Sequence, residues 1–184
     1  SGEHLESAVC DTDPGSEGMQ PVGARALASG AEATASAVNA FTADAREALR
    51  DQDGANMVLL RGMSQLPDLP QMGSVYQLDP VGIAAYPMYR GLANLVGMKV
   101  VNGSETFDDE LDALEESYRD HDFLFLHYKP ADAAGEDGDF DAKVVALEEL
   151  DASIPRILGL GPDVLVVAGD HSTPAIMGAH SWHP

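Results

Sequence analysis

The sequence has 184 residues, 45% of them apolar, which is enough for the packed core of one ordinary domain or of two small ones. Thirty-one acidic residues against ten basic ones give a net charge of -21, which argues against nucleic acid and anionic membranes as partners. The charge fits a surface adapted to a salty cytoplasm or an acidic protein that binds cations, and the scarcity of lysine favours the first hypothesis. Cys10 is the single cysteine, and the chain shows neither a secretory signal nor a run of 18 apolar residues, so we expect a reducing cytoplasm, no disulfide and no membrane span.

The first part of the chain, to about residue 73, is rich in Gly, Ala, Ser and Thr. Its pattern predicts short helices over Glu32–Val38 and Thr42–Arg50, and a buried strand over Asn56–Arg61. The stretch from Gly62 to Gly73 contains prolines and glycines typical of a loop, and it is a candidate domain boundary.

The pattern becomes more regular after residue 74. Val81–Tyr86 and Met98–Val101 are predicted strands, and a helix beginning at Pro87 lies between them. Such a strand–helix–strand unit is typical of a parallel sheet. An acidic helix beginning at Thr106 and a strand over Phe123–Tyr128 are expected to follow.

Two more elements are expected before the end of the sequence. Apolar residues recur at steps of three and four from Phe140 to Ile157, which predicts an amphipathic helix with a kink near Pro155. Asp163–Ala168 is nearly all apolar, and we expect it to be the last strand, buried on both faces. The predicted fold class is therefore α/β.

Metal-ligand residue types crowd the ends of the last two predicted strands. In a parallel α/β sheet, functional residues gather just past the carboxyl ends of strands. A mixture of carboxylates and imidazoles suits Mn²⁺ or Zn²⁺ better than Ca²⁺ or Mg²⁺. The carboxylates and imidazoles concerned are Asp132 and Glu136 after the first of these strands, and Asp170, His171, His180 and His183 after the second.

Structural alternatives exist for several of these polar residues. Acidic loop residues in so acidic a chain can be solvated surface, and Asp139 can serve the start of the following helix. His127 lies inside a predicted strand, where a core role and a functional role are equally open. For Asp170 and His171 the functional interpretation is favoured, because two polar residues after a buried strand cost desolvation free energy unless they are paired.

The order of the motifs matches one known family. The segments are Asp11–Gly15, Ile83–Ala93, Leu95–Met98, Asp132–Lys143, Gly169–Pro174 and His180–Pro184. Together they cover nearly the whole chain and resemble archaeal-type cofactor-independent phosphoglycerate mutases of the alkaline phosphatase superfamily. A bare Gly-Asp-His would be weak support, but the ordered set is specific.

The resemblance implies an alkaline-phosphatase-like, mostly parallel sheet flanked by helices, plus part of an inserted α+β domain. Residues 1–73 would be the C-terminal part of that inserted, substrate-clamping domain, and residues 74–184 the later half of the metal-binding catalytic domain. Two divalent metal ions are implied, Mn²⁺ foremost and Zn²⁺ or Co²⁺ as alternatives, without bisphosphoglycerate.

The family pattern also implies roles for individual residues. By position, Asp170 and His171 would ligate one metal, while Asp132, Glu136 and His180 would ligate the other. Position 136 is commonly His in that family and is Glu here, so an altered ligand and a lost ligand are both open.

The implied reaction is the interconversion of 2- and 3-phosphoglycerate, in glycolysis and gluconeogenesis, by way of an enzyme phosphoserine. Arg61, Arg90, Lys129 and His183 would contact the substrate. The family's nucleophilic serine lies in an N-terminal segment without a counterpart here, so these 184 residues alone are expected to be inactive. An exposed sheet edge would then favour a homo-oligomer.

Three alternatives stay open. A sibling phosphatase or phosphodiesterase would share the metal ligands. A sibling mutase acting on a sugar phosphate fits the first 100 residues less well. As isolated, the chain could also be a non-catalytic, metal-binding fragment.

Overall fold

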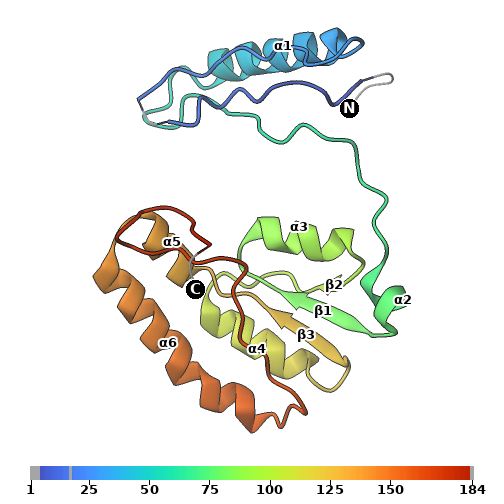
Figure 1. The fold of residues 1–184 in the computed structure, drawn as a ribbon, viewed down its shortest axis with the longest axis vertical. Coiled ribbons are helices and arrows are strands. Elements are labelled where there is room, and N and C mark those ends of the chain that lie inside the picture. The colour runs from blue at the N-terminus through green and yellow to red at the C-terminus, as the bar shows by residue number, and fades with distance from the viewer. Residues whose placement is uncertain (1–4, 17, 183–184) are drawn as a thin grey trace. The chain divides into compact units, whose positions relative to one another are not determined.

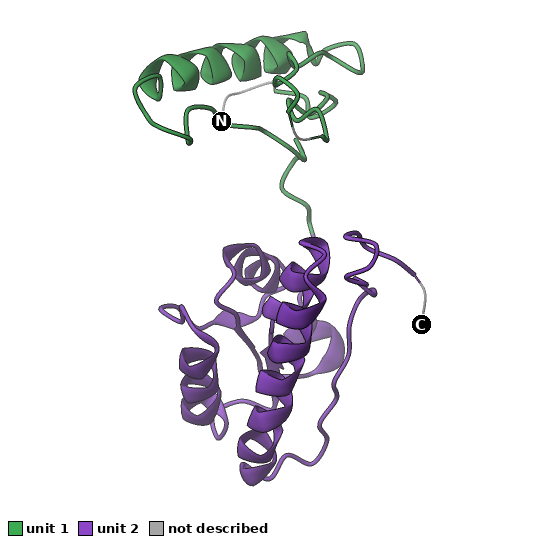
Figure 2. Ribbon diagram, turned by 90° about the vertical axis from the view of Figure 1, so that its left-hand side faces the viewer, with its two compact units in different colours: residues 1–68 green, residues 69–184 purple. Residues whose placement is uncertain are grey.

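The computed structural model describes residues 5–16 and 18–182 (Figure 1). The chain divides into two compact units, Ser1–Asp68 and Leu69–Pro184, each with its own hydrophobic cluster (Figure 2). The division falls within the loop expected between Gly62 and Gly73. No helix among the described residues is both long and apolar enough to span a bilayer.

The first unit is built on one long helix, α1 (Glu32–Ala48). The prediction of two short helices here was wrong, because nothing in the intervening residues Asn39–Phe41 breaks a helix. Thr42, the expected cap of the second helix, instead donates its hydroxyl hydrogen bond back to the Asn39 carbonyl at 3.0 Å. Ser and Thr commonly make this bond inside helices.

The predicted strand over Asn56–Arg61 is also absent from the described structure. These residues are irregular, and Leu60 pairs with a single buried residue, Thr12. The Leu60 amide donates to Thr12 Oγ1 at 2.8 Å, and the Thr12 amide donates to the Leu60 carbonyl at 2.9 Å. The apolar segment Asn56–Arg61 is therefore hydrogen-bonded to Thr12 through Leu60 and not to a neighbouring strand. The core of this unit is small: Val9, Ala24, Ala31 and Ala35.

The second unit contains a three-stranded parallel sheet in the order β2-β1-β3, which confirms the predicted α/β class. The strands are β1 (Pro80–Ile83), β2 (Lys99–Val100) and β3 (Phe123–Leu126), and each is shorter than predicted. The helices of this unit are α2 (Met72–Tyr76), α3 (Pro87–Leu95), α4 (Phe107–Ser117), α5 (Pro130–Glu136) and α6 (Phe140–Gly159).

The alternation of side chains along β1 explains how helices cover both faces of the sheet (Figure 1). Val81 and Ile83 are buried in one cluster with Ala113 of α4, against which Ile157 of α6 also packs. Gly82 points the other way, toward α3, and a Cβ atom there would lie 2.8 Å from the Ala93 Cβ. The glycine thus lets α3 approach the sheet closely.

Two predicted helix starts are confirmed by their caps. Thr106 Oγ1 accepts from the Asp109 amide at 3.2 Å, and the Asp109 carboxylate accepts from the Thr106 amide at 2.9 Å, which forms a capping box before α4. Asp139 Oδ1 accepts from the Ala142 amide at 2.9 Å at the start of α6. The structural alternative for Asp139 is therefore the correct one.

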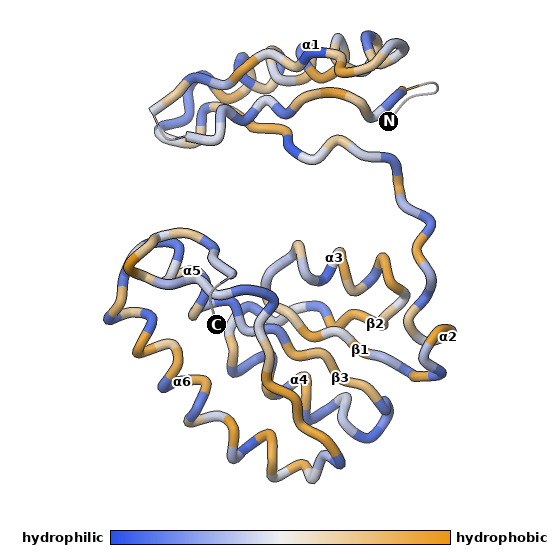
Figure 3. The backbone as a smooth tube through the Cα atoms, viewed as in Figure 1, coloured by the Kyte–Doolittle hydropathy of each residue, from blue (hydrophilic) through white to orange (hydrophobic). Residues whose placement is uncertain are grey.

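The strand predicted over Asp163–Ala168 does not form. Val164, Val166 and Val167 are 77%, 75% and 69% exposed, whereas a strand buried on both faces was expected. The segment is visible as a hydrophobic stretch that precedes the C-terminal residues (Figure 3). An apolar run becomes a strand only when a second strand satisfies its backbone groups. No described residue pairs with this segment.

A buried carboxyl group, that of Glu110, lies between α4 and the carboxyl end of β1. Glu110 is 3% exposed and accepts a hydrogen bond from the Ala85 amide. Burial raises the pKa of this carboxyl to about 7, and the Ala85 hydrogen bond offsets only part of that rise. The folded chain therefore holds a proton that the unfolded chain releases at lower pH.

We expect the second unit to lose stability as the pH rises from about 4.5 to about 7, because the folded pKa of Glu110 lies above its unfolded value. Glu110→Gln keeps an acceptor for Ala85 and removes the charge. It should flatten this dependence and stabilise the unit by about 1 to 2 kcal/mol above pH 7. Urea unfolding at pH 5 and pH 8 measures the effect, with Glu116→Gln on the exposed side of α4 as the control. An unchanged pH dependence in Glu110→Gln would contradict the assignment.

Candidate metal centre

Helix α5 places two carboxylates at the carboxyl end of β3. It begins at Pro130, and proline is favoured in the first turn, where an amide hydrogen bond is not needed. Asp132 and Glu136 are four residues apart and so share one face of the helix. The side chain of Asp132 is 25% exposed and that of Glu136 is 43% exposed. Both predicted ligands of α5 therefore reach the same surface.

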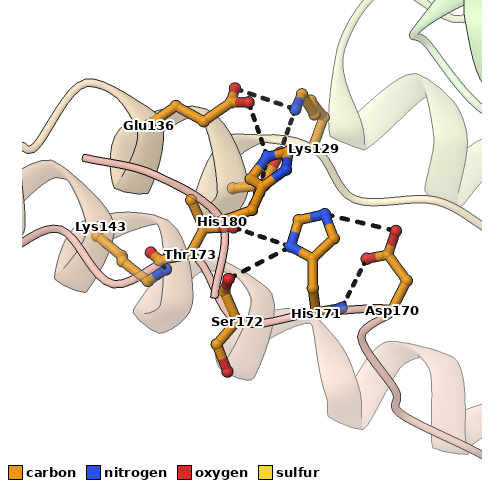
Figure 4. Close-up of polar contacts among 9 residues, drawn as sticks. Lys129, Glu136, Lys143, Asp170, His171, Ser172, Thr173 and His180 are labelled. Atoms are coloured by element: carbon orange, nitrogen blue, oxygen red, sulfur yellow. Dashed lines mark hydrogen bonds and ion pairs between the residues drawn. The ribbon is translucent and has the colours of Figure 1, made fainter. Parts of the chain in front are cut away.

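A backbone bridge brings the two C-terminal histidines together. The Ser172 amide donates to the Ser181 carbonyl at 3.0 Å, and the Ser181 amide donates to the Ser172 carbonyl at 2.7 Å. The bridge closes the intervening loop and sets His171 beside His180 (Figure 4). The two imidazole rings stack with centroids 3.9 Å apart.

Three of the predicted ligands converge on one point. Asp132, His171 and His180 each offer a ligand atom, and these atoms all lie within 4.8 Å of one another. Within this set, His180 Nε2 lies 3.8 Å from Asp132 Oδ1. A carboxylate with two imidazoles is a donor set typical of Zn²⁺ and of Mn²⁺.

The other two predicted ligands lie at the margin of this cluster. Glu136 Oε1 is 2.9 Å from His180 Nε2, so Glu136 contacts a member of the cluster. Asp170 Oδ2 is 3.6 Å from His171 Nε2, and its side chain is 74% exposed (Figure 4). The structure thus gathers all five predicted ligands in one region, with three at its centre.

Lys129 supplies positive charge to the cluster. Its ammonium group donates to Asp132. It also donates to Glu136 Oε2 at 3.3 Å (Figure 4). Burial alone would lower the pKa of Lys129, but these hydrogen bonds outweigh it and raise that pKa. Burial likewise acts to raise the pKa of Asp132, and hydrogen bonds from Lys129 and Thr173 lower it below its ordinary value. These contacts favour the ionised form of Asp132, which is the form that ligates a cation.

Of the four predicted substrate-binding residues, Lys129 lies at the cluster. Arg61 belongs to the first unit, where its side chain is 73% exposed and its Nη1 lies 3.5 Å from Asp13 Oδ2. Arg90 donates to the carbonyls of Ala84 and Ala85 at 3.3 and 3.0 Å, and these hydrogen bonds stabilise the loop after β1. His183 lies outside the described residues.

His127 takes part in an aromatic stack near the end of β3. Its ring stacks on Tyr89 of α3 with centroids 3.6 Å apart. Its Nδ1 is buried, and it has no hydrogen-bond partner among the described residues. Burial lowers the pKa of His127 and favours the neutral ring. These contacts fit the core alternative left open by the sequence.

Sequence reasoning assigned no role to two residues that hold the cluster together. Thr173, 5% exposed, donates its hydroxyl hydrogen bond to Asp132. Lys143 of α6 donates to the Thr173 carbonyl at 2.6 Å. The scarcity of lysine was a usable signal, because a lysine close to predicted metal ligands is conspicuous in a chain this acidic.

A family model described as the metalloenzyme superfamily matches residues 11–184. The chain belongs to this superfamily. Curated members of similar sequence include a probable 2,3-bisphosphoglycerate-independent phosphoglycerate mutase of Thermus thermophilus, 50% identical over the whole chain, and one of Thermotoga maritima, 47% identical. In both cases the alignment covers 46% of the relative, so the chain spans about half the length of the curated relatives it matches.

Solved structures agree with this relationship. The PH0037 protein of Pyrococcus horikoshii superposes with a TM-score of 0.65 at 26% identity, over 82% of this chain and 45% of that one. The cofactor-independent phosphoglycerate mutase of Thermoplasma acidophilum gives a TM-score of 0.50 at 22% identity, over 88% of this chain and 46% of that one, and supports the fold. The family resemblance inferred from the ordered motifs is confirmed: the chain is a homologue of cofactor-independent phosphoglycerate mutases.

We expect Mn²⁺ to bind this metalloenzyme-superfamily chain through the central cluster. Asp132→Asn and His180→Ala should each weaken binding at least about tenfold, because each removes a candidate ligand. Isothermal titration with Mn²⁺ measures the change. Asp137→Asn, an exposed carboxylate at the end of α5, is the matched control and should leave the affinity unchanged. Equal affinities for Asp132→Asn and Asp137→Asn would remove Asp132 from the site.

Proposed function

We propose that the chain is part of a metal-dependent phosphoglycerate mutase, which interconverts 2- and 3-phosphoglycerate without a bisphosphoglycerate cofactor. The observation that carries the proposal is the cluster of Asp132, His171 and His180, whose ligand atoms lie within 4.8 Å of one another. A cluster of this kind also suits many hydrolases. The mutase is favoured because the likeness to probable mutases extends over the whole chain, the first unit included.

The donor set fits the proposed cofactor, a pair of divalent ions with Mn²⁺ foremost and Zn²⁺ or Co²⁺ as alternatives. Asp132, His171 and His180 would bind one ion together, a grouping that differs from the family resemblance, which implies that His171 and Asp170 ligate the other ion. Glu136 and Asp170 would complete the set at either side. Such an ion, when bound, supplies Lewis acidity toward an oxygen of a phosphoryl group. Asp132 is prepared for this role by the contacts that lower its pKa.

The cations of the chain would bind the anionic substrate. Lys129 lies beside the cluster and can exchange its contacts with Asp132 and Glu136 for a phosphate or carboxylate oxygen. Arg61, with a largely exposed guanidinium group, is a second candidate, because its planar fork can hold such a group through two parallel hydrogen bonds. Arg90 and His183 complete the proposed set.

In this proposal, residues 1–73 belong to a substrate-clamping domain inserted in the parent enzyme, and residues 74–184 form the later half of its catalytic domain. The separate hydrophobic clusters of the two units support the division. The nucleophilic serine would lie in the part of the parent outside this sequence. We therefore infer that these 184 residues alone do not catalyse the reaction.

The exposed apolar run at Val164–Val167 supports association between copies of the isolated chain. An extended segment with unpaired backbone groups is a natural template for a second strand. We include a homo-oligomer in the proposal for this reason. A cytoplasmic location follows from the proposed glycolytic reaction.

The test is enolase-coupled turnover of 3-phosphoglycerate by the full-length parent protein in the absence of bisphosphoglycerate. We expect activity that chelation abolishes and Mn²⁺ restores, because the metal centre is required for phosphoryl transfer. The 184-residue chain, assayed in parallel, should show no turnover.

Other outcomes would redirect the proposal. Hydrolysis of simple phosphate esters by the parent, without mutase turnover, would favour a sibling phosphatase that shares the metal ligands. Turnover by the 184-residue chain alone would overturn the assignment of the nucleophile to another segment.

A further inference from the structure

Thr173 links the segment that carries His171 to both helices α5 and α6. Its carbonyl accepts a hydrogen bond from Lys143 Nζ of α6 at 2.6 Å (Figure 4). Its hydroxyl donates to Asp132 of α5, and its Oγ1 lies 3.2 Å from His171 Nδ1. Thr173 therefore contacts two of the three central candidate ligands, and it is 5% exposed.

Gly135 makes this attachment sterically feasible. A Cβ atom at Gly135 would overlap the Thr173 carbonyl oxygen and lie 3.0 Å from both Lys143 Nζ and Thr173 Cγ2. Gly135 is not among the glycines with positive φ, so its backbone conformation does not require glycine. The close approach of Thr173 does require it. Thr173 thus rests directly on the backbone of α5 and is held there by Lys143.

We propose that Lys143 is a positioning residue of the metal centre, which holds the Thr173 carbonyl on Gly135 and thereby keeps His171 beside Asp132. The inference rests on the metal centre of the proposed function, and it adds a role for Lys143, Gly135 and Thr173. Lys143 acts through Thr173 and is assigned no contact with the metal or the substrate.

Charge and position predict opposite effects when Lys143 is neutralised. An ammonium group close to a divalent cation repels it, so removal of the charge alone would strengthen metal binding. Loss of the Lys143–Thr173 hydrogen bond would instead free the His171 segment and weaken metal binding. The sign of the change in affinity therefore separates the two effects.

The experiment compares Lys143→Met with Lys143→Arg in the full 184-residue chain. Methionine has a similar length but donates no hydrogen bond, and arginine keeps both charge and donor. We expect Lys143→Met to weaken Mn²⁺ binding about 10- to 100-fold, the range usual for residues that orient metal ligands, and Lys143→Arg to recover much of it. If Lys143→Met binds Mn²⁺ as tightly as the unsubstituted 184-residue chain, or more tightly, the proposal is overturned.

A glycine pair gives an independent variant. Gly135→Ala should displace Thr173 and weaken Mn²⁺ binding in the same direction. Gly159→Ala, in the last turn of α6, is the matched control, because a Cβ atom there meets nothing within 4 Å. Equal Mn²⁺ affinities for the two alanine variants would also overturn the proposal.

A readout without metal separates this proposal from the proposed function. Hydrogen exchange of the Ser172 and Ser181 amides reports the backbone bridge that sets His171 beside His180. We expect these two amides to exchange faster in Lys143→Met and Gly135→Ala. In Lys143→Arg and Gly159→Ala they should exchange as in the unsubstituted 184-residue chain. If the unsubstituted 184-residue chain binds no Mn²⁺ but these amides respond as expected, the proposed metal centre is contradicted. The role of Lys143 in positioning His171 is then still supported. Unchanged amide exchange in both Lys143→Met and Gly135→Ala overturns the positioning role, whether or not the chain binds Mn²⁺.

Discussion

The hydrogen bond from Thr173 to Asp132 is the contact on which the candidate site depends. It joins residues that are 41 positions apart, one on a helix that continues directly from the sheet and one on an irregular segment. The position of Asp132 is set by α5, which follows strand β3. The histidines have no such support, since the residues before them form no strand. The attachment at Thr173 and the bridge between Ser172 and Ser181 supply it instead.

Repulsion among the carboxylates is the second constraint on the candidate site. In a chain with a net charge of -21, a further set of converging carboxylates raises the local repulsion. Lys129 offsets part of that repulsion by contacting Asp132 and Glu136, and Lys143 lies close by on the Thr173 carbonyl. Lys129 is the residue proposed to bind the anionic substrate, and Lys143 is the one proposed to orient the metal ligands. Their positions therefore connect the stability of the site with its proposed function.

The sequence allowed much of the second unit to be predicted because its signals are local. The periodicity around β1, α3 and β2 and the Thr106 cap of α4 each lie within a few residues of the element they define. The two wrong strands, Asn56–Arg61 and Asp163–Ala168, share one cause. An apolar run shows that a segment can form a strand, but whether a second strand lies beside it is not a local property.

The same distinction applies to the site. Asp132, His171 and His180 were predictable because metal-ligand residue types followed predicted strands, and all three meet in the structure. The roles of Thr173 and Lys143 were not predictable in this way, because their contacts join residues 41 and 30 positions apart. The scarcity of lysine makes Lys143 conspicuous but does not indicate its partner. Arg90 donates to the backbone carbonyls of Ala84 and Ala85, a contact that the sequence did not indicate, and its contact with the substrate stays a prediction.

The proposed metal centre requires that Asp132, His171 and His180 bind one metal ion together. X-ray absorption spectroscopy of the chain loaded with one equivalent of Zn²⁺ or Mn²⁺ tests it most directly, because imidazole ligands give a characteristic multiple-scattering pattern. We expect a mixed nitrogen and oxygen shell with two imidazoles, and the loss of one imidazole in His180→Ala. A shell of oxygen atoms alone would contradict it, since the ion would then be bound by surface carboxylates.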